Sequence, residues 1–302
     1  ESKFINPLIK LLSNTADILP GIFGMEGQRT YLILFQNNME LRPSGGFIGS
    51  YGILKVKLGR ITEFSIHDVY DADGQLRGHV EPPFAVRRHL PSVHWYLRDS
   101  NFDIDFVKSA SVSSNFLFAE TGQKVSGVIG VDVSFVKNIL EALGPVYVAD
   151  YKEMVDQNNL YMLTQAHSEK NFFPGSTQKK DFLRSLYKAM LAKISGENTQ
   201  YLSLVKALSD SLSQKHLIFA FNDNIQNIFT VNGWSSSLWD ERKEDEKSVN
   251  DFLGINEANL GVNKVNYFIS RQVTQKIIID NNGNVSSELS ISYKNASTSW
   301  PG

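Results

Sequence analysis

The sequence contains no cysteine and no apolar run long enough to cross a membrane, which takes about 18 residues. The lack of cysteine excludes disulfides, thiol nucleophiles, and zinc or iron–sulfur sites built on thiolates. An excess of positive charge is missing as well, because 30 basic and 32 acidic residues give a net charge of −2. We therefore expect no nucleic-acid partner, and any anionic ligand must be bound by a few local cations.

Common catalytic motifs are also absent. The six histidines have no tight ligand spacing, which disfavours a zinc enzyme, and no nucleophile elbow, P-loop or dinucleotide-binding glycine motif occurs. Residues 71–74 look like part of a calcium loop, but the remaining ligands of such a loop are missing. What the chain does have is 302 residues, 42% of them hydrophobic, which is ample for a globular core.

Hydrophobic periodicity and turn signals predict an α/β fold. The predicted elements, in chain order, are a helix at 7–19, strands at 30–35, 47–57 and 60–67, a helical stretch at 84–97, a helix capped by Asp103 or Asp105 and running to about 120, a strand at 125–131, a helix at 136–143, a strand at 146–149, helices at 183–194 and 201–212, a strand at 216–221, and hairpin strands at 263–280 and 285–294. The segment 125–149 predicts a right-handed β-α-β crossover. We therefore expect a central mixed β-sheet flanked by helices, with a C-terminal β-hairpin.

Three regions follow from this pattern. Residues 1–28 form an N-terminal packing helix and lead-in, residues 29–262 form the α/β core domain, and residues 263–302 form the hairpin. The hairpin either joins the edge of the core sheet or begins a separate β-domain. Because the chain starts at Glu1 rather than Met, and stops just after a strand-like segment, we expect a piece of a longer protein with a signal or anchor helix upstream.

The most informative stretch is 36–51, which follows a buried strand and contains Arg42, Gly45 and Gly46. Adjacent glycines allow positive φ and close approach of the backbone, and a guanidinium beside them suits carboxylate or phosphate oxygens. Two interpretations stay open. The stretch is either an anion-binding site or a structural turn in which Arg42 binds carbonyl groups.

A polar loop at 68–83 carries three acidic residues, Asp68, Asp71 and Asp73. Long loops at strand ends often carry function, and Mg²⁺ in phosphate sites takes one or two carboxylates together with phosphate oxygens. The simpler interpretation is a solvated acidic turn, since loops favour aspartate. Arg98, which precedes another aspartate, is likewise either a cation of the site or part of a salt-bridged turn.

Two further cations are candidates. Lys264 follows a glycine-containing turn at 259–263. Arg184 lies in a basic row with Lys180 and Lys188, on the helix face opposite an apolar stripe. Burial of that stripe accounts for the helix by itself, and such basic rows are usually only solvated.

Four separated motifs carry a resemblance to a known family. They are YLILFQNNMELRPSGGFIGSY at 31–51, VSGVIGVD at 125–132, LGPV at 143–146 and NLGVNK at 259–264. In this order they closely resemble the domain of unknown function 4012 of bacterial envelope proteins. That resemblance implies no particular activity.

More remotely, the order of elements resembles that of LytR-CpsA-Psr proteins, extracytoplasmic phosphotransferases that move glycopolymers from polyprenyl pyrophosphate onto the cell wall. The chain departs from that family at two arginine motifs. It has Ile66-His67-Asp68 where the family has Pro-Arg-Asp, and residues 167–170 read HSEK where paired arginines are expected. Two pyrophosphate clamps are therefore missing, which indicates altered chemistry or none.

The resemblances imply an extracytoplasmic cell-envelope protein, membrane-anchored in its full length, that binds a phosphorylated or polyprenyl-linked glycan precursor or another envelope polymer. If it is a glycopolymer transferase, three sets of residues are expected to act: Asp68, Asp71 and Arg98 in catalysis; Arg42, Gly45, Gly46, Arg184 and Lys264 in ligand binding; and Asp71 and Asp73 as ligands of Mg²⁺.

The alternative is a non-enzymatic envelope scaffold or adhesion module, while a cytosolic hydrolase is disfavoured because no nucleophile motif occurs. The transferase interpretation requires Arg42, an acidic-loop aspartate and another cation to lie within reach of one pyrophosphate, beside an apolar cavity.

Overall fold

The computed structural model describes residues 19–90, 92–169, 178–196, 199–221, 234–238, 253–261 and 263–297, without the side chains of residues 168, 169 and 178–180. The predicted helix at 7–19 lies outside this part of the chain except for its last residue. The described elements are α2 (Leu19–Ile22), β1 (Arg29–Arg42), β2 (Gly45–Lys57), β3 (Arg60–Asp68), α3 (Val69–Asp73), α4 (Phe84–His89), η1 (Leu97–Asp99), α5 (Phe106–Thr121), β4 (Gly127–Asp132), α6 (Val133–Leu143), β5 (Val146–Val148), β6 (Glu153–Val155), α7 (Leu160–Glu169), α8 (Gln178–Ile194), α9 (Tyr201–Ser213), β7 (Leu217–Phe221), η2 (Val265–Phe268), β8 (Ile269–Ile279) and β9 (Val285–Asn295).

Five strands form a mixed central sheet in the order β3-β2-β1-β4-β7. The first three strands are an antiparallel meander, β4 runs parallel to β1, and β7 runs antiparallel to β4. Leu58 and Gly59 turn the chain between β2 and β3 with φ values of 50° and 74°, as a two-residue hairpin turn requires. The predicted fold class, a mixed sheet flanked by helices, is confirmed.

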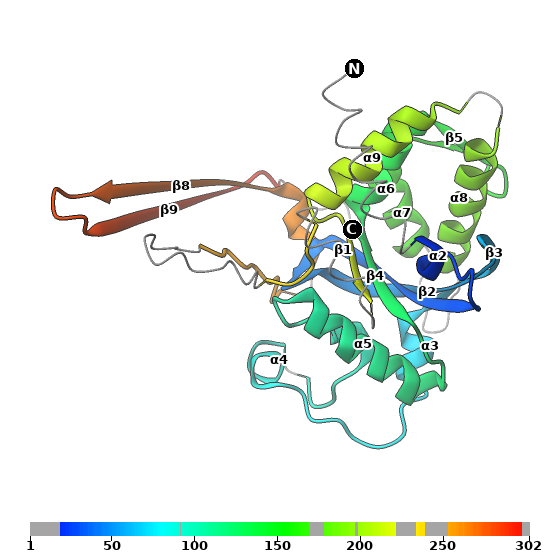
Figure 1. The fold of residues 1–302 in the computed structure, drawn as a ribbon, viewed down its shortest axis with the longest axis horizontal. Helices are drawn as coiled ribbons and strands as arrows, with labels where there is room; N and C mark the ends of the chain where they lie inside the picture. Colours follow the sequence, from blue (N-terminus) through cyan, green and yellow to red (C-terminus); the bar gives the residue numbers. More distant parts are fainter. Residues whose placement is uncertain are drawn as a thin grey trace.

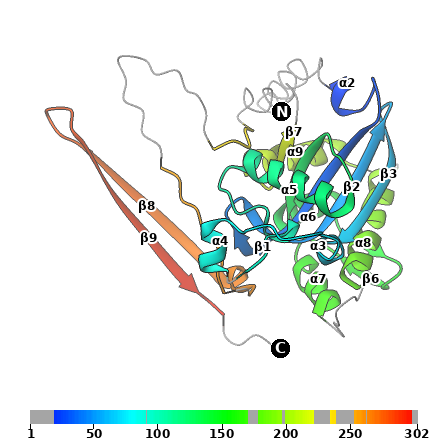
Figure 2. The same cartoon turned by 90° about the horizontal axis from the view of Figure 1, so that it is seen from below.

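Helices cover both faces of this sheet (Figures 1 and 2). On one face α5 packs against β4 and β7, and α3 packs against β2, above a core that includes Leu32 and Leu34. On the other face α6 packs against β1 and β4, α8 against β3, and α9 against β7. A second core, which includes Leu140 and Phe182, fills the space among α6, α7, α8 and the small β5–β6 sheet. Each such fully buried side chain stabilises the fold by roughly 1.5–3 kcal/mol.

Aspartates start several of the helices. The carboxylate of Asp105 accepts hydrogen bonds from the backbone N–H groups of Val107 and Lys108, so the predicted N-cap of α5 is confirmed. Asp68 caps α3 and Asp132 caps α6 in the same way, each directly after a strand. Such caps satisfy backbone donors that the first helical turn leaves unpaired, and each contributes about 1 kcal/mol. The predicted acidic loop therefore begins as a short helix.

The stretch 36–46, which the sequence predicts as a connection between two strands, is largely part of the strands themselves. β1 continues to Arg42, and the pairing jumps from Asn37 with Phe47 to Leu41 with Gly46, which leaves a bulge. A Cβ atom on Gly46 would lie 2.2 Å from the backbone C and O of Asn37, and Gly45 has φ of 142°. The two glycines are therefore explained by the close approach of β2 to β1.

The predicted β-α-β crossover is wrong. β5 does not pair with β4 but forms an antiparallel two-stranded sheet with β6, and the parallel pair is β1 with β4. Val146 and Val148 of β5 are buried in the core beside α8. Packing against that helix, rather than pairing with the central sheet, holds this short strand in place.

The predicted C-terminal hairpin is confirmed. β8 and β9 pair with each other along their whole length, the turn contains Gly283 with φ of 83°, and the hairpin projects from the body of the protein (Figure 1). Among the described strands it forms a sheet of its own and does not extend the edge of the central sheet. That it begins a further β-domain stays a prediction. No helix in the described ranges is both long enough and apolar enough to span a bilayer.

Candidate functional site

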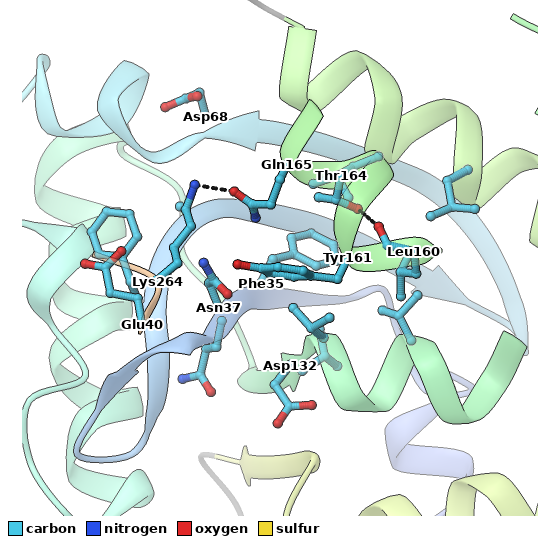
Figure 3. A pocket seen from close by; sticks show the side chains of 18 of the residues that line it. Phe35, Asn37, Glu40, Asp68, Asp132, Leu160, Tyr161, Thr164, Gln165 and Lys264 are labelled. Atoms are coloured by element: carbon cyan, nitrogen blue, oxygen red, sulfur yellow. Dashed lines mark hydrogen bonds between the residues drawn. The ribbon is translucent and has the colours of Figure 1, made fainter. Parts of the chain in front are cut away.

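A cavity of about 350 Å³ lies between the sheet and the helices α6, α7 and α8 (Figure 3). This volume is within the range of small-molecule pockets, about 300–1,000 Å³. Its apolar walls include Phe35, Val131, Val136, Leu160, Leu183 and Leu186. Its polar lining includes Asn37, Glu40, Asp68, Asp132, Gln165 and Lys264. The position at the carboxyl ends of β1, β3 and β4 is where ligands bind in open α/β sheets.

The sheet brings two aspartates from distant parts of the chain to this cavity. Asp68 ends β3 and its Oδ1 accepts from the backbone N–H of Tyr70 at 2.9 Å. Asp132 ends β4 and its Oδ1 accepts from the backbone N–H of Phe135 at 2.9 Å. Both carboxylates are held in place because each serves as a helix cap, and the predicted site residue Asp68 lies in the pocket wall.

Lys264 is the second predicted site residue that lines the pocket. Its ammonium donates a hydrogen bond to Oε1 of Gln165, which is buried on α7 (Figure 3). The preceding segment is fixed to the sheet, because the backbone N–H of Asn259 donates to the carbonyl of Leu41 at 2.9 Å. The Asn259 side chain in turn donates to Oδ1 of Asn266 at 2.8 Å. The sequence motif at 259–264 therefore positions a lysine in the wall of the cavity.

A polar network beside the pocket was missed by the sequence analysis. Oδ2 of Asp132 lies 2.7 Å from Nδ1 of His216 and accepts from the amide of Asn38 at 2.9 Å. Asn38 also donates to Oγ of Ser134. One signal was available, because Asp132 stands between a predicted strand and a predicted helix. The pocket residues Tyr161, Thr164 and Gln165 of α7 gave no sequence signal of this kind.

Arg42 lies outside the pocket lining and is buried, with 3% of its surface exposed. Its Nη1 donates to the carbonyls of Leu41 and Asn259 at 3.1 Å, and its Nη2 donates to Oε1 of Glu40 at 3.0 Å. These contacts are those of a structural arginine that binds carbonyl groups, the second of the two interpretations. Gly45 and Gly46 likewise serve the approach of two strands.

Arg98 does not line the pocket itself but contacts a tyrosine that does. Its guanidinium stacks over Tyr70, which lines the pocket, and over Tyr96, with centroid distances of 5.2 and 4.6 Å. Its Nη1 donates to Oδ2 of Asp73 at 2.9 Å, and its Nε lies 3.5 Å from Oδ2 of Asp99. The interpretation as a salt-bridged group therefore describes Arg98 well, although the residue adjoins the site.

Burial perturbs the carboxyl groups around Arg98. Burial raises the pKa of Asp73 to about 7, with the nearby Arg98 opposing the shift. Burial also raises the pKa of Glu120 to about 8, and the charge of Asp73 adds to the effect. Oδ1 of Asp73 and Oε2 of Glu120 have no hydrogen-bond partner among the described residues. Near neutral pH this cluster therefore retains protons that exposed carboxyl groups would have lost.

The remaining predicted residues are not part of the pocket wall. Asp71 is exposed, whereas Asp73 is buried and pairs with Arg98 at 2.9 Å. No group of three or more histidine, aspartate or glutamate side chains in the described ranges could hold a metal ion. Binding of Mg²⁺ by Asp71 and Asp73 together with phosphate oxygens, which needs only two carboxylates, stays a prediction. Arg184 is exposed on α8 and pairs with Asp181 at 3.5 Å, although Leu183 of the same helix lines the pocket.

Residues 26–167, just under half of the chain, match the family described as "Protein of unknown function (DUF4012)". The first resemblance is therefore confirmed over this part, which contains β1 to β4 and the glycine-rich bulge. A comparison with curated proteins gives no match.

Solved structures with a similar arrangement of elements include the Lin1025 protein from Listeria innocua, at 11% identity and a TM-score of 0.38, over 87% of this chain and 91% of that one. They also include the LytR-Csp2A-Psr enzyme from Actinomyces oris, at 12% identity and a TM-score of 0.38, over 69% of this chain and 75% of that one. TagV from B. subtilis is similar at 8% identity and a TM-score of 0.39, over 69% and 81%. Likeness at this level concerns the arrangement of helices and strands and does not extend to ligands or chemistry.

Proposed function

We propose that this protein binds a lipid-linked envelope precursor, with the lipid chain in the pocket and its phosphate beside Lys264. One observation supports this most directly: the cavity has apolar walls, and polar side chains gather toward one side of it. Figure 3 places Lys264, Gln165 and Asn37 on one side and Leu160 on the other. An amphiphile matches such a pocket because its chain buries apolar surface, at about 0.8 kcal/mol for each methylene, while its head group meets the polar side.

The cellular setting is part of the same proposal. A bacterial envelope location outside the cytoplasm is supported by the family match over residues 26–167 and by the resemblance to LytR-CpsA-Psr proteins. Anchoring to the membrane would be supplied by a segment outside the described residues. A polyprenyl-linked glycan is the ligand that this setting and the apolar cavity favour together.

Binding is proposed rather than group transfer. Transfer from a pyrophosphate needs several cations that neutralise the developing charge. Arg42 is engaged with Glu40 and backbone carbonyls, and Arg98 is engaged with Asp73 and Asp99. The combination of Arg42, an acidic-loop aspartate and a further cation around one ligand is therefore not assembled at the pocket.

A scaffold or adhesion role is the second candidate, and the β8–β9 hairpin favours it. Alternate residues of the paired strands place an apolar row on one face, and several of its members are at least 40% exposed: Val273, Ile277, Ile279, Val285, Leu289 and Tyr293. An exposed apolar face of this kind typically marks an interaction site. This role requires no occupied pocket.

Lipid binding measured by isothermal titration calorimetry tests the proposal. Farnesyl phosphate is expected to bind the wild-type protein, and Leu183→Glu should weaken binding at least about tenfold, because a carboxylate would enter an apolar wall. The matched control is Leu191→Glu, which changes an exposed leucine of the same helix and should bind as wild type does. Absence of binding to the wild-type protein, or equal loss in both variants, would contradict the proposal.

A further inference from the structure

The charges of the pocket wall limit the head group that it can hold. Among the described residues that line the cavity, Lys264 is the only basic one, whereas Glu40, Asp68 and Asp132 are acidic. A pocket for a polyanion would show the opposite balance, because phosphate charges are normally met by several lysines, arginines or a metal ion. The excess of acidic over basic residues in the lining therefore disfavours a ligand with many negative charges.

Two of these carboxylates have partners of their own. Glu40 accepts from Arg42 at 3.0 Å, and Asp132 is bound by Asn38 and lies 2.7 Å from the ring of His216. Asp68 accepts from the backbone N–H of Tyr70, and no ion pair of Asp68 occurs among the contacts of the described residues. Its negative charge therefore acts directly on whatever occupies the polar side of the pocket.

The neighbouring arginines do not reverse this balance. Arg42 faces Glu40 at 3.0 Å and Asp99 at 3.9 Å, and Arg98 faces Asp73 at 2.9 Å and Asp99 at 3.5 Å. Each guanidinium is thus close to two carboxyl groups. Recruiting either one to a ligand would leave a buried carboxyl group without its partner, which is costly.

Neutral donors are available in the wall. Oδ1 of Asn37 accepts from the backbone N–H of Met39, and Oε1 of Gln165 accepts from Lys264. Because the carboxamide oxygens are used in this way, each side chain offers its NH₂ group to a ligand. One ammonium and two amide groups suit the oxygens of one phosphate.

We propose that the pocket selects an amphiphile with a single phosphate group over the corresponding diphosphate. This inference rests on the proposed function and names its ligand class. A second phosphate would add negative charge near Asp68 without a further cation, and like charges within several ångströms repel appreciably in a partly buried site. The single phosphate is either a free lipid monoester or a diester that links the lipid to a sugar.

The test compares four ligands that share one lipid chain: farnesol, farnesyl methyl phosphate, farnesyl phosphate and farnesyl diphosphate. Their affinities are measured by calorimetry at pH 7.5 in EDTA. At least one single-phosphate ligand is expected to bind about tenfold or more tightly than the diphosphate. Tighter binding of the diester indicates a glycan-linked ligand, and tighter binding of the monoester indicates a free lipid phosphate.

The variant Asp68→Asn sharpens the comparison, because asparagine also caps helices well and removes only the charge. This variant should reduce, several-fold, the difference in affinity between the single-phosphate ligands and the diphosphate. Glu63→Gln, which removes an exposed carboxylate from the same strand, should leave this difference in affinity unchanged. The inference would be overturned if the diphosphate bound as tightly as the single-phosphate ligands, or if farnesol were the only one of the four ligands to bind. Either result would still agree with a pocket that binds lipid. Failure of all four ligands would instead refute the proposed function.

Discussion

Nη1 of Arg98 donates a 2.9 Å hydrogen bond to Oδ2 of Asp73, and this ion pair ties the end of α3 to η1. The same short helix is capped by Asp68, in the pocket wall, and contains Tyr70, over which the Arg98 guanidinium stacks. A buried carboxyl cluster and the polar side of the cavity therefore share one structural element.

The first prediction concerns pH. The pKa values of Asp73 and Glu120 are raised in the folded protein to about 7 and about 8, from 3.8 and 4.5, so the folded state binds more protons than the unfolded state between these values. The free energy of unfolding contributed by this pair is therefore fully present below about pH 4 and is lost as the pH rises to about 8. The two shifted pKa values correspond to a loss of several kcal/mol, measured by urea unfolding across this range.

Glu120→Gln separates this effect from other titrating groups. Glutamine keeps an oxygen for the N–H of Leu97 but carries no charge at any pH. In this variant the free energy of unfolding should fall less between pH 4 and pH 8 than in the wild-type protein. The variant should therefore be more stable than wild type at pH 8. An unchanged dependence on pH would show that Glu120 titrates normally.

The second prediction concerns the glycine-rich bulge. Gly46→Ala should destabilise the protein by about 3 kcal/mol or more, because the new Cβ would collide with backbone atoms of Asn37 that cannot move aside without opening the sheet. Gly27→Ala is the control, since no atom lies within 4 Å of its added Cβ, and it should change stability by less than about 0.5 kcal/mol. Chemical unfolding compares the two, and equal stabilities would mean that the strands are not in close contact there.

The third prediction decides between the two interpretations of Arg42. Arg42→Met should lower the free energy of unfolding by about 3–5 kcal/mol, because it leaves Glu40 buried without its cation and removes one of the two arginines near Asp99. Arg184→Met removes an exposed arginine and should cost less than about 0.5 kcal/mol. The folded fraction of the Arg42 variant should bind farnesyl phosphate as wild type does. Loss of phosphate binding with an intact fold would support the anion-site interpretation instead.

The fourth prediction concerns Asp132. Asp132→Ala removes the cap of α6 and the acceptor for Asn38 and His216, and should lower the free energy of unfolding by about 2–4 kcal/mol. Asp132→Asn keeps a capping oxygen, so its loss should be about 1 kcal/mol smaller. Urea unfolding of both variants tests this ranking, which would fail if asparagine were as harmful as alanine.

Local signals made much of the fold predictable from the sequence. The Asp105 cap and the short turns between the strands predicted at 47–57 and 60–67, and at 263–280 and 285–294, each depend on residues a few positions apart, and the structure has this cap and both turns. The short strand β5 was misplaced because its apolar pattern does not say which surface buries it. Val146 and Val148 satisfy that pattern by packing beside α8.

The site was less predictable because its parts meet only in three dimensions. Asp68 and Lys264 were identified by their places after a strand and beside a glycine turn, and both line the cavity. For Arg42 the sequence leaves two interpretations open, because the Asn259 carbonyl that helps to bury it comes from a part of the chain far away in sequence. The apolar walls come from α6, α7 and α8, and no local pattern shows that these helices leave a cavity between them.

The parallel pairing of β1 with β4 has a consequence for how the chain acquires its structure. β1, β2 and β3 are neighbours in sequence and can associate early, whereas the other side of β1 must wait until β4 is available, about a hundred residues later. A nascent meander would thus pass through a stage in which β1, like the edge strand β3, has an unpaired side, and intermolecular pairing there competes with folding. Pulse-labelled hydrogen exchange during refolding should find amides of the β2–β3 hairpin protected before those of β4, and simultaneous protection would rule out this order of assembly.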